Sequence, residues 1–449
     1  MIDVTRLLKK LLGPEFEDPR DWKRMAELLR PWPRAPLDVA GIRPGLYHYQ
    51  READGTFTRF HLRVDSTGQG LLLANASAAA KLRPSGVIIA KGLLEGDEQG
   101  PIVDRLVRSF YGVTPQQAAA DVERIRAIIA TLDSPGDNYP ILNLADPSFS
   151  PEIAPLDKPL SADVPPAPSE RLVAILDRLW EMAVPHVTLI AGENPKPADL
   201  VRAVERAEDL GMIAGVRGRG TDLVQGTLIK DLAQAGVDHV DVLYLSDSPE
   251  VHDALAGTGD HQNALETLDA VHQNEVCPVA EVPLVESSLE TIEETLDALA
   301  GRGIHNAAFF AVATAERGPS GGALAAGALL QAARLVEESA EEAEVRYLWY
   351  PPVQFDPTRT LAEQVRGGPR CSGDSAVRVE PDGSVIPARG PYRPGGNLFS
   401  EDWETIRRSE VFKSYRQRVE TDTHCDDCPG LAICAADCPR NPAGWAGGN

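Results

Sequence analysis

The feature of this sequence that most constrains its fold is an alternation of short apolar runs with amphipathic stretches between residues 159 and 350. Several amphipathic stretches end at a glycine, as at Gly211 and Gly236, which is typical of helices because glycine readily adopts the left-handed conformation that ends them. The apolar runs are short enough to be buried strands. They span residues 159–164, 187–190, 212–216, 240–245, 277–282 and 307–312, with a last run at 345–350.

Strands that alternate with helices predict an α/β protein with a parallel sheet, because each helix carries the chain back to the end where the preceding strand began. Ser287 and Glu290 predict a capping box for the helix at 289–299. Such a series of βα units forms an open sheet or a full or partial barrel, and the spacing alone does not choose between them. The other helices expected here span residues 169–183, 200–210 and 228–235.

Residues 42–134 follow a different pattern, in which three short strands precede three helices. This order predicts a small winged-helix-like domain. The expected strands are residues 45–51, 57–64 and 70–73, and the expected helices are residues 78–82, 100–111 and 115–132. The whole chain then divides into a helical lead-in at 1–41, this domain at 42–134, a Pro-rich linker at 135–158, the βα region at 159–350 and a Cys-rich tail at 351–449.

Composition narrows the function classes. The chain has 44 Lys+Arg against 67 Asp+Glu, a formal net charge of -23, and no basic run. This balance argues against nucleic acid and against anionic membranes as partners, since both are bound through Lys and Arg. The N-terminus does not have the pattern of a signal peptide, and no apolar stretch is long enough to span a membrane. We therefore expect a soluble, cytoplasmic protein.

The cysteines are unevenly placed. Cys425, Cys428, Cys434 and Cys438 follow one another closely in the tail, and Cys371 lies upstream. Thiolates at this spacing suit a tetrahedral zinc ion or an iron–sulfur cluster. Cysteines of a cytoplasmic protein stay reduced, which favours metal ligation over disulfides. Cys277, inside an apolar strand, is interpreted as a core residue.

The tail carries a resemblance to a known domain. Cys371 is followed by Gly383, Gly396-Asn397-Leu398, Trp403, Phe412 and the Cys-x2-Cys-x5-Cys-x3-Cys run from Cys425 to Cys438. This pattern resembles the SPASM domain, the C-terminal auxiliary-cluster domain of radical S-adenosylmethionine (SAM) enzymes that modify peptides. The resemblance implies a SPASM-like domain that binds a metal or cluster.

Upstream segments resemble other parts of such enzymes. Residues 191–195, Ala-Gly-Glu-Asn-Pro, are similar to the Gly-Gly-Glu-Pro segment after the second strand of the radical SAM barrel, and residues 247–253 to the segment after its fourth strand. The resemblance implies a partial (β/α)6 TIM-type barrel in which Gly192 and Glu193 mark the SAM-binding segment. Residues 71–79 and 111–114 are similar to the PqqD-like peptide-chaperone domain of pyrroloquinoline quinone biosynthesis. That domain binds leader peptides by adding their strand to a sheet edge.

The chain departs from the family at its chemical centre. Radical SAM enzymes cleave SAM with a cluster held by a Cys-x3-Cys-x2-Cys loop after the first barrel strand. Here residues 165–168, Pro-Pro-Ala-Pro, lead straight into the helix at Ser169, and no cysteine precedes Cys277. We therefore expect no reductive SAM cleavage by the family mechanism, with Gly192 and Glu193 as a vestigial SAM segment.

The tail is also depleted, because Ala388 stands where the family has a cysteine ligand. The remaining thiolates predict one metal centre built from Cys425, Cys428, Cys434 and either Cys438 or Cys371. A [4Fe–4S] cluster follows from the resemblance, and a single Zn²⁺ ion is the alternative.

Two functions follow from these patterns. The first is a catalytically degenerate radical-SAM/SPASM-like protein in the maturation of a ribosomally made peptide or peptide-derived cofactor. It would bind the leader or substrate peptide and dock an active radical SAM or other modifying enzyme. The second is a non-radical enzyme that uses the C-terminal face of the barrel, with a structural metal in the tail. Side chains considered for that face are Arg217, Arg219, Asp247, His252 and His261, each of which also has a purely structural interpretation.

Overall fold

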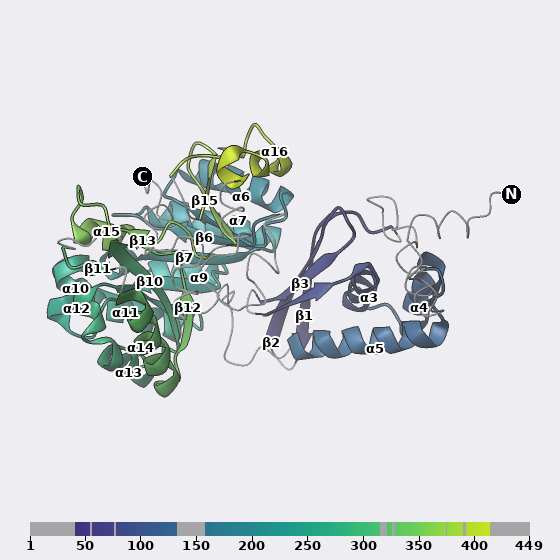
Figure 1. Cartoon of the computed structure of the whole chain (residues 1–449), viewed down its shortest axis with the longest axis horizontal. Coiled ribbons are helices and arrows are strands. Elements are labelled where there is room, and N and C mark those ends of the chain that lie inside the picture. The colour runs from purple at the N-terminus through teal and green to yellow at the C-terminus, as the bar shows by residue number, and fades with distance from the viewer. Residues whose placement is uncertain are drawn as a thin grey trace, which may run out of the picture.

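The structure is a computed structural model, and it describes residues 41–53, 56–75, 78–132, 158–314, 321–325, 328–373, 375–388 and 392–413. These residues form two lobes, each built around one β-sheet (Figure 1). The lead-in predicted at 1–41 falls almost wholly outside the described residues, and so does the cysteine run from Cys425 to Cys438.

The smaller lobe contains a four-stranded antiparallel sheet in the order β1-β2-β3-β4, covered by three helices. On β2, Phe60, Leu62 and Val64 are buried against the helices. Because side chains alternate along a strand, the intervening Arg59, His61 and Arg63 lie on the opposite face. The elements are β1 (Gly45–Ala53), β2 (Thr56–Val64), β3 (Gly70–Ala74), β4 (Ala78–Leu82), α3 (Pro84–Leu94), α4 (Gln99–Ser109) and α5 (Pro115–Leu132).

Two sequence predictions in this lobe had different outcomes. The helix predicted over 115–132 is confirmed as α5. The helix predicted over 78–82 is wrong, because these residues form β4 and pair with β3 from Gly70 to Ala74. Alanine favours a helix locally, but strand pairing buries Leu82 and overrides that preference. The helix starts instead at Pro84. Proline is tolerated there because backbone N–H groups in the first turn of a helix have no acceptor within the helix.

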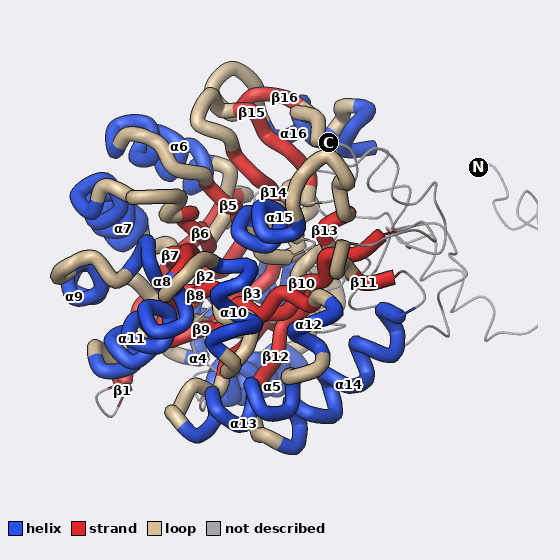
Figure 2. The backbone as a smooth tube through the Cα atoms, turned by 90° about the vertical axis from the view of Figure 1, so that its left-hand side faces the viewer, coloured by secondary structure: helices blue, strands red, loops and turns tan. Residues whose placement is uncertain are grey.

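The larger lobe contains parallel strands in the order β5-β6-β7-β8-β9-β10, as the βα repeat predicts. Figure 2 shows these strands surrounded by helices. The strands are β5 (Ser161–Val164), β6 (His186–Ile190), β7 (Ile213–Arg219), β8 (His239–Leu243), β9 (Cys277–Leu284) and β10 (Asn306–Thr314). The helices are α6 (Ser169–Glu181), α7 (Pro197–Leu210), α8 (Gly220–Leu223), α9 (Leu228–Gln234), α10 (Pro249–Ala256), α11 (Asp260–Gln273), α12 (Glu286–Leu289), α13 (Ile292–Gly301) and α14 (Leu329–Glu342).

The barrel is partial. Strands β11 (Leu324–Ala325), β12 (Arg346–Trp349) and β13 (Val353–Gln354) pair with β10 at one edge of the sheet. In the part of the chain that the structure describes, none of them pairs with β5. Strand β5 instead pairs with β14 (Ala376–Val379), which continues into β15 (Ser384–Pro387) and β16 (Gly396–Asn397). Two short helices, α15 (Leu361–Gly367) and α16 (Trp403–Arg407), complete the described tail.

The capping box predicted from Ser287 and Glu290 is wrong. Ser287 lies inside α12, and the helix expected over 289–299 is broken between α12 and α13. The neighbouring Ser288 forms the local bonds instead, because its hydroxyl accepts from the Val285 N–H at 3.0 Å and donates to the Pro283 carbonyl at 2.8 Å.

The smaller lobe docks on the end of the barrel where the strands begin, through the polar face of β2. Arg59 forms an ion pair of 3.1 Å with Asp238 and donates to the Met212 carbonyl at 3.2 Å. Arg63 donates to the Pro159 carbonyl at 2.9 Å. Pro159 lies two residues before β5 and Asp238 one residue before β8. These bonds therefore join the polar face of β2 to the floor of the barrel.

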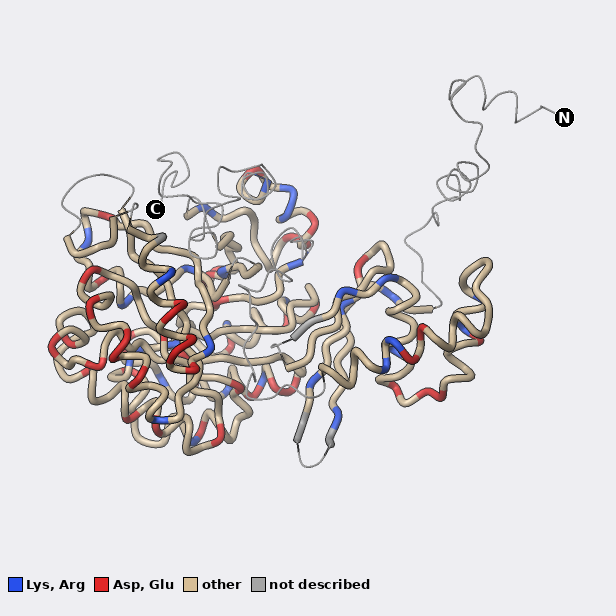
Figure 3. Tube along the Cα trace, turned by 60° about the horizontal axis from the view of Figure 1, so that its bottom comes forward, with Lys and Arg blue, Asp and Glu red and all other residues tan. Residues whose placement is uncertain are grey.

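Asp and Glu residues are frequent along the chain of the larger lobe, where Figure 3 colours them red. Helix α13, for example, has Glu293 and Glu294 in its first turn. Among the described residues, none of the helices combines the length and apolar character that crossing a membrane would require.

Candidate functional site at the C-terminal end of the barrel

Ionisable side chains occupy the inside of the barrel. On β5, Ala162 and Val164 pack outward against the helices, so Asp163 between them points inward. The same alternation on the other strands places further polar groups inside, and all of them are buried. The inward polar set is Asp163 on β5, Thr188 on β6, Arg217 on β7, Asp241 on β8 and Glu281 on β9.

Arg217 is the centre of this set. Its guanidinium lies 2.9 Å from the Asp163 carboxylate and 3.7 Å from that of Glu281. It also donates to the Pro369 carbonyl at 3.1 Å. Burial disfavours its charge, but the neighbouring carboxylates outweigh this and raise the pKa of Arg217. Arg217 was considered in the sequence as a loop residue for binding a carboxylate; in the structure it binds carboxylates of its own chain.

The segment between α15 and β14 lies over these charges. Ser372 donates to Asp163 through its backbone N–H at 2.9 Å and through its hydroxyl at 3.0 Å. Burial raises the pKa of Asp163, although Arg217 and the bonds from Ser372 favour its ionised form. Residues 369–372 thus provide hydrogen-bond partners for Arg217 and Asp163. In a barrel open at its C-terminal end, a bound ligand would provide such partners.

Glu281 is the least satisfied member of the set. Its side chain is buried, and its Oε2 atom has no hydrogen-bond partner among the described residues. Burial raises the pKa of Glu281 to about 7, even though Arg217 favours the ionised form. A buried carboxyl group with a pKa near neutrality is able to give or accept a proton at physiological pH.

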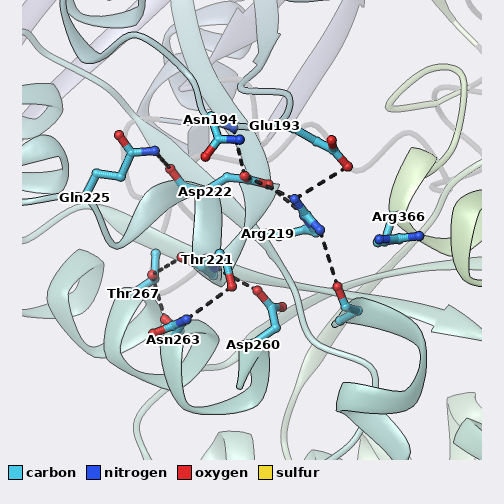
Figure 4. A network of polar contacts seen from close by, with 12 residues as sticks. Glu193, Asn194, Arg219, Thr221, Asp222, Gln225, Asp260, Asn263, Thr267 and Arg366 are labelled. Atoms are coloured by element: carbon cyan, nitrogen blue, oxygen red, sulfur yellow. Dashed lines mark hydrogen bonds and ion pairs between the residues drawn. The ribbon is translucent and has the colours of Figure 1, made fainter. Parts of the chain in front are cut away.

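A second network lies at the rim of the barrel (Figure 4). Arg219 forms an ion pair of 2.7 Å with Asp222 and a longer one of 3.7 Å with Glu193. Asp222 in turn accepts from the Asn194 N–H at 3.1 Å. The hydrogen bonds that Arg219 donates to Asp222 raise the pKa of Arg219. Glu193, predicted as part of the vestigial SAM segment, therefore belongs to an ion-pair network at the rim, with 73% of its side chain exposed.

Gly192 lies in a left-handed conformation with φ of +72°. A Cβ atom at this position would lie 2.4 Å from Cγ of Pro166, in the loop between β5 and α6. That loop is also held by Asp199, which accepts from the Ser169 N–H at 3.2 Å. Pro166 thus packs directly against Gly192, and residues 165–168 offer no thiolate for a cluster. The residues present do not fit a cluster-bound SAM at this place.

The histidines near the fourth barrel strand are held within the protein. His252 accepts from the Leu245 N–H at 3.2 Å and lies 3.0 Å from Asp260. Asp260 also accepts from the Thr221 N–H at 2.7 Å. Burial opposes its charge, but the bonds from His252 and Thr221 outweigh this and lower the pKa of Asp260. These contacts join α8, α10 and α11, which supports the structural interpretation of His252.

Asp247 and His261, the two other residues considered near the fourth barrel strand, both lie beside Tyr244. The Tyr244 hydroxyl donates to Asp247 at 2.9 Å, and the rings of Tyr244 and His261 lie 5.6 Å apart. The helix cap at this point is Ser248, whose hydroxyl accepts from the Val251 N–H, so Asp247 is not the cap of α10.

Cys371 is the one predicted metal ligand that lies within the described residues, and it is buried against Ala376 and Ala388. Burial raises the pKa of its thiol, which favours the protonated form over the thiolate that a metal requires. Within the described ranges, no three His, Cys, Asp or Glu residues are grouped to hold a metal ion. Ligation by Cys425, Cys428, Cys434 and Cys438 remains a prediction, because these residues lie outside the described part of the chain.

Comparison with known proteins gives a structural likeness. SuiB of Streptococcus suis bound to S-adenosylmethionine superposes with a TM-score of 0.54 at 12% sequence identity, covering 90% of this chain and 99% of SuiB. SuiB bound to its precursor peptide SuiA gives a TM-score of 0.51 at the same 12% identity, covering 85% and 96% of the two chains. The chain has the fold of SuiB. No protein-family model matches the sequence, and a search of curated proteins finds no match.

The SuiB likeness extends over both lobes, since it covers nearly the whole chain. Together with the parallel sheet, it confirms the partial TIM-type fold. At 12% identity the likeness to SuiB is one of fold, and it does not transfer the ligands of SuiB to this chain.

The pKa of Glu281 yields a stability prediction. The folded-state pKa of about 7 lies above the ordinary value of 4.5, so the folded barrel binds this proton more tightly than the unfolded chain. The resulting stabilisation is present below about pH 4.5 and is lost as the pH rises through about 7. In Glu281→Gln this dependence should disappear. We expect a difference on the order of 3 kcal/mol between the pH responses of the two proteins, measured by urea unfolding.

Glu205→Gln provides the control, because Glu205 is exposed on α7. This variant should follow the wild-type pH response. Identical pH responses for wild type and Glu281→Gln would contradict the assignment.

Proposed function

We propose that this protein is a catalytically degenerate relative of the radical SAM/SPASM enzymes that acts in the maturation of a peptide by binding it, without reductive cleavage of SAM. The observation that carries the proposal is the loop between β5 and α6. It has no thiolate, and its Pro166 occupies the space beside Gly192. The barrel interior is instead filled by the ion pairs of Arg217.

A peptide is the ligand class that the fold favours. SuiB, which shares this fold, was crystallised bound to its precursor peptide. The smaller lobe presents two edge strands, since β1 pairs only with β2 and β4 only with β3 among the described residues. An edge strand pairs readily with an added peptide strand. We assign leader binding to this sheet, and binding of the core peptide or of an active modifying enzyme to the barrel.

The second candidate, a non-radical enzyme, is supported by Glu281. Its pKa of about 7 and its position beside Arg217 suit acid–base chemistry on a substrate with a carboxylate or carbonyl group. Such a substrate would have to displace residues 369–372, which bind Arg217 and Asp163. Glu281→Gln would abolish turnover of this kind while leaving peptide binding by the smaller lobe unchanged.

The loss of SAM chemistry is tested directly. Protein incubated with SAM and a strong reductant should give no 5′-deoxyadenosine above a heat-denatured sample, while an active radical SAM enzyme run in parallel does. Glu193→Gln should behave like the wild type, because Glu193 is engaged by Arg219. Formation of 5′-deoxyadenosine by the wild type would overturn the proposal. A lower yield in Glu193→Gln would then place the SAM site at Glu193.

Peptide binding is tested with the full chain and a leader peptide encoded beside its gene. We expect micromolar affinity, with hydrogen–deuterium exchange slowed in one edge strand of the smaller sheet, β1 or β4, because the added strand takes up its free backbone groups. A scrambled peptide of the same composition is the control. Equal protection by both peptides, or protection only on the barrel, would refute leader binding by this sheet.

The tail metal is tested by replacing its predicted ligands. Anaerobically purified wild type should contain one centre, with the absorbance of an iron–sulfur cluster or, for zinc, no visible colour. Cys425→Ser/Cys428→Ser should lose the metal, and Cys371→Ala shows whether Cys371 is a ligand. Cys277→Ala is the matched control, because Cys277 lies in β9 and accepts from Asn306. Metal-free wild type would contradict both forms of the prediction.

A further inference from the structure

Buried histidines meet where the smaller lobe docks on the barrel. His186 and His239 are the first residues of β6 and β8, and His61 reaches them from β2. All three are buried, with 1% of His61, 5% of His186 and 2% of His239 exposed. His61 and His186 are close enough for their charges to interact. None of the three belongs to the rim or to the predicted peptide-binding edges.

The hydrogen bonds define which ring nitrogens carry protons. His61 Nε2 lies 2.6 Å from the Gly211 carbonyl, which only accepts, so Nε2 carries the proton. In neutral His61, Nδ1 is then an acceptor. His239 Nδ1 lies 2.6 Å from the Asp241 carboxylate, so Nδ1 of His239 is also a donor.

The contact between His186 and His239 determines how the proton on His239 affects His186. Their Nε2 atoms lie 2.9 Å apart, so one of them donates and the other accepts. When His239 carries two protons, its Nε2 donates, and neutral His186 holds its proton on Nδ1. When His239 is neutral, His186 must donate through Nε2, and its Nδ1 becomes an acceptor.

Buried polar atoms at this floor without a hydrogen-bond partner among the described residues include Nδ1 of His61, Nδ1 of His186 and Oγ of Ser161. Ser161 and His186 are register partners on adjacent strands. Buried polar atoms in native proteins are nearly always paired with protein or ordered water. A water molecule suits a polar site with several such partners.

We propose that His61, His186, His239 and Asp241 form a buried proton-binding site that is complete only while the smaller lobe is docked on the barrel. The ligand is one proton from solvent, held on His239 between Asp241 and His186. His186 then presents its Nδ1–H, and a water molecule connects this donor to Nδ1 of His61. Protonation adds one positive charge and breaks no covalent bond other than that of the proton donor.

The electrostatic surroundings favour this placement of the proton. Burial disfavours the charge of His239, but Asp241 outweighs this and raises its pKa. Burial lowers the pKa of His61 to about 3 and lowers that of His186 as well, so these two rings stay neutral near pH 7. The other titratable or charged groups facing the site are His48 on β1, Arg59 on β2, Asp163 on β5, Glu208 on α7, Asp238 before β8, Cys277 on β9 and Tyr350 after β12.

The direction in which pH changes the stability of docking follows from the raised pKa of His239. Above the ordinary value of 6.5, an unfolded or undocked chain has lost this proton, whereas the docked protein retains it. The proton therefore stabilises docking below 6.5 in full, and the stabilisation is lost as the pH rises through the folded-state pKa of His239. Docking should therefore weaken as the pH rises above that folded-state pKa.

The test is nuclear magnetic resonance of the full chain with ¹⁵N-labelled histidine. At about pH 6, below the ordinary pKa of 6.5, we expect both nitrogens of His239 to be protonated, with His186 in the Nδ1–H form and His61 in the Nε2–H form. In Asp241→Asn, His239 should become neutral and His186 should change to the Nε2–H form. In His61→Phe, which removes the acceptor, His239 should release its second proton about tenfold more readily, the worth of one buried hydrogen bond.

His272→Gln is the matched control, since His272 is an exposed histidine on α11, and it should leave the titration of His239 unchanged. Amide exchange of residues 59–64 and 208–215 should be faster in Asp241→Asn than in His272→Gln. Neutral His239 in the wild type at about pH 6.5 would overturn the proposal. So would a His239 titration in His61→Phe equal to that of His272→Gln. If Asp241→Asn does not fold, the wild type and His61→Phe decide the matter.

Discussion

The buried ion pair between Arg217 and Asp163 holds together parts of the chain that are distant in sequence. It joins β7 to β5 at 2.9 Å, and the bonds from Ser372 to Asp163 attach the tail to the same point. Removing one partner of such a pair leaves a buried charge without compensation, which costs about 3–5 kcal/mol. The open edge of the barrel and the tail hairpin that extends it therefore depend on one set of charges.

The βα repeat was predictable from sequence because the outward faces of the strands and the helices that cover them are consistently apolar. The interior was not predicted, although its signal was present. Asp163, Arg217 and Glu281 are single charges inside apolar runs, and all lie on inward positions of their strands. A charge in a buried strand must find a partner. The alternation of side chains shows that these residues share the interior, but only the pairing of the strands shows which of them meet.

Other features depended on tertiary contacts that no local pattern contains. The residues of β4 favour a helix until β3 lies beside them. His61 and Gly211 are 150 positions apart, so the sequence gives no reason to connect them. The prediction that a helix ends at Gly211 is confirmed. The absence of a side chain at Gly211 also makes room for the docked smaller lobe. A Cβ atom there would lie 2.5 Å from the His48 ring.

The protein's own polar groups close both ends of the barrel. At the floor, β2 contributes His61 and two arginines; at the mouth, residues 369–372 contribute a carbonyl to Arg217 and two donors to Asp163. A ligand that entered the mouth would have to replace those bonds, because an unpaired buried charge is costly. Replacement requires an acceptor for Arg217 beside a donor for Asp163. A peptide backbone offers that combination at every residue except proline, so the charges of this interior are compatible with a peptide ligand.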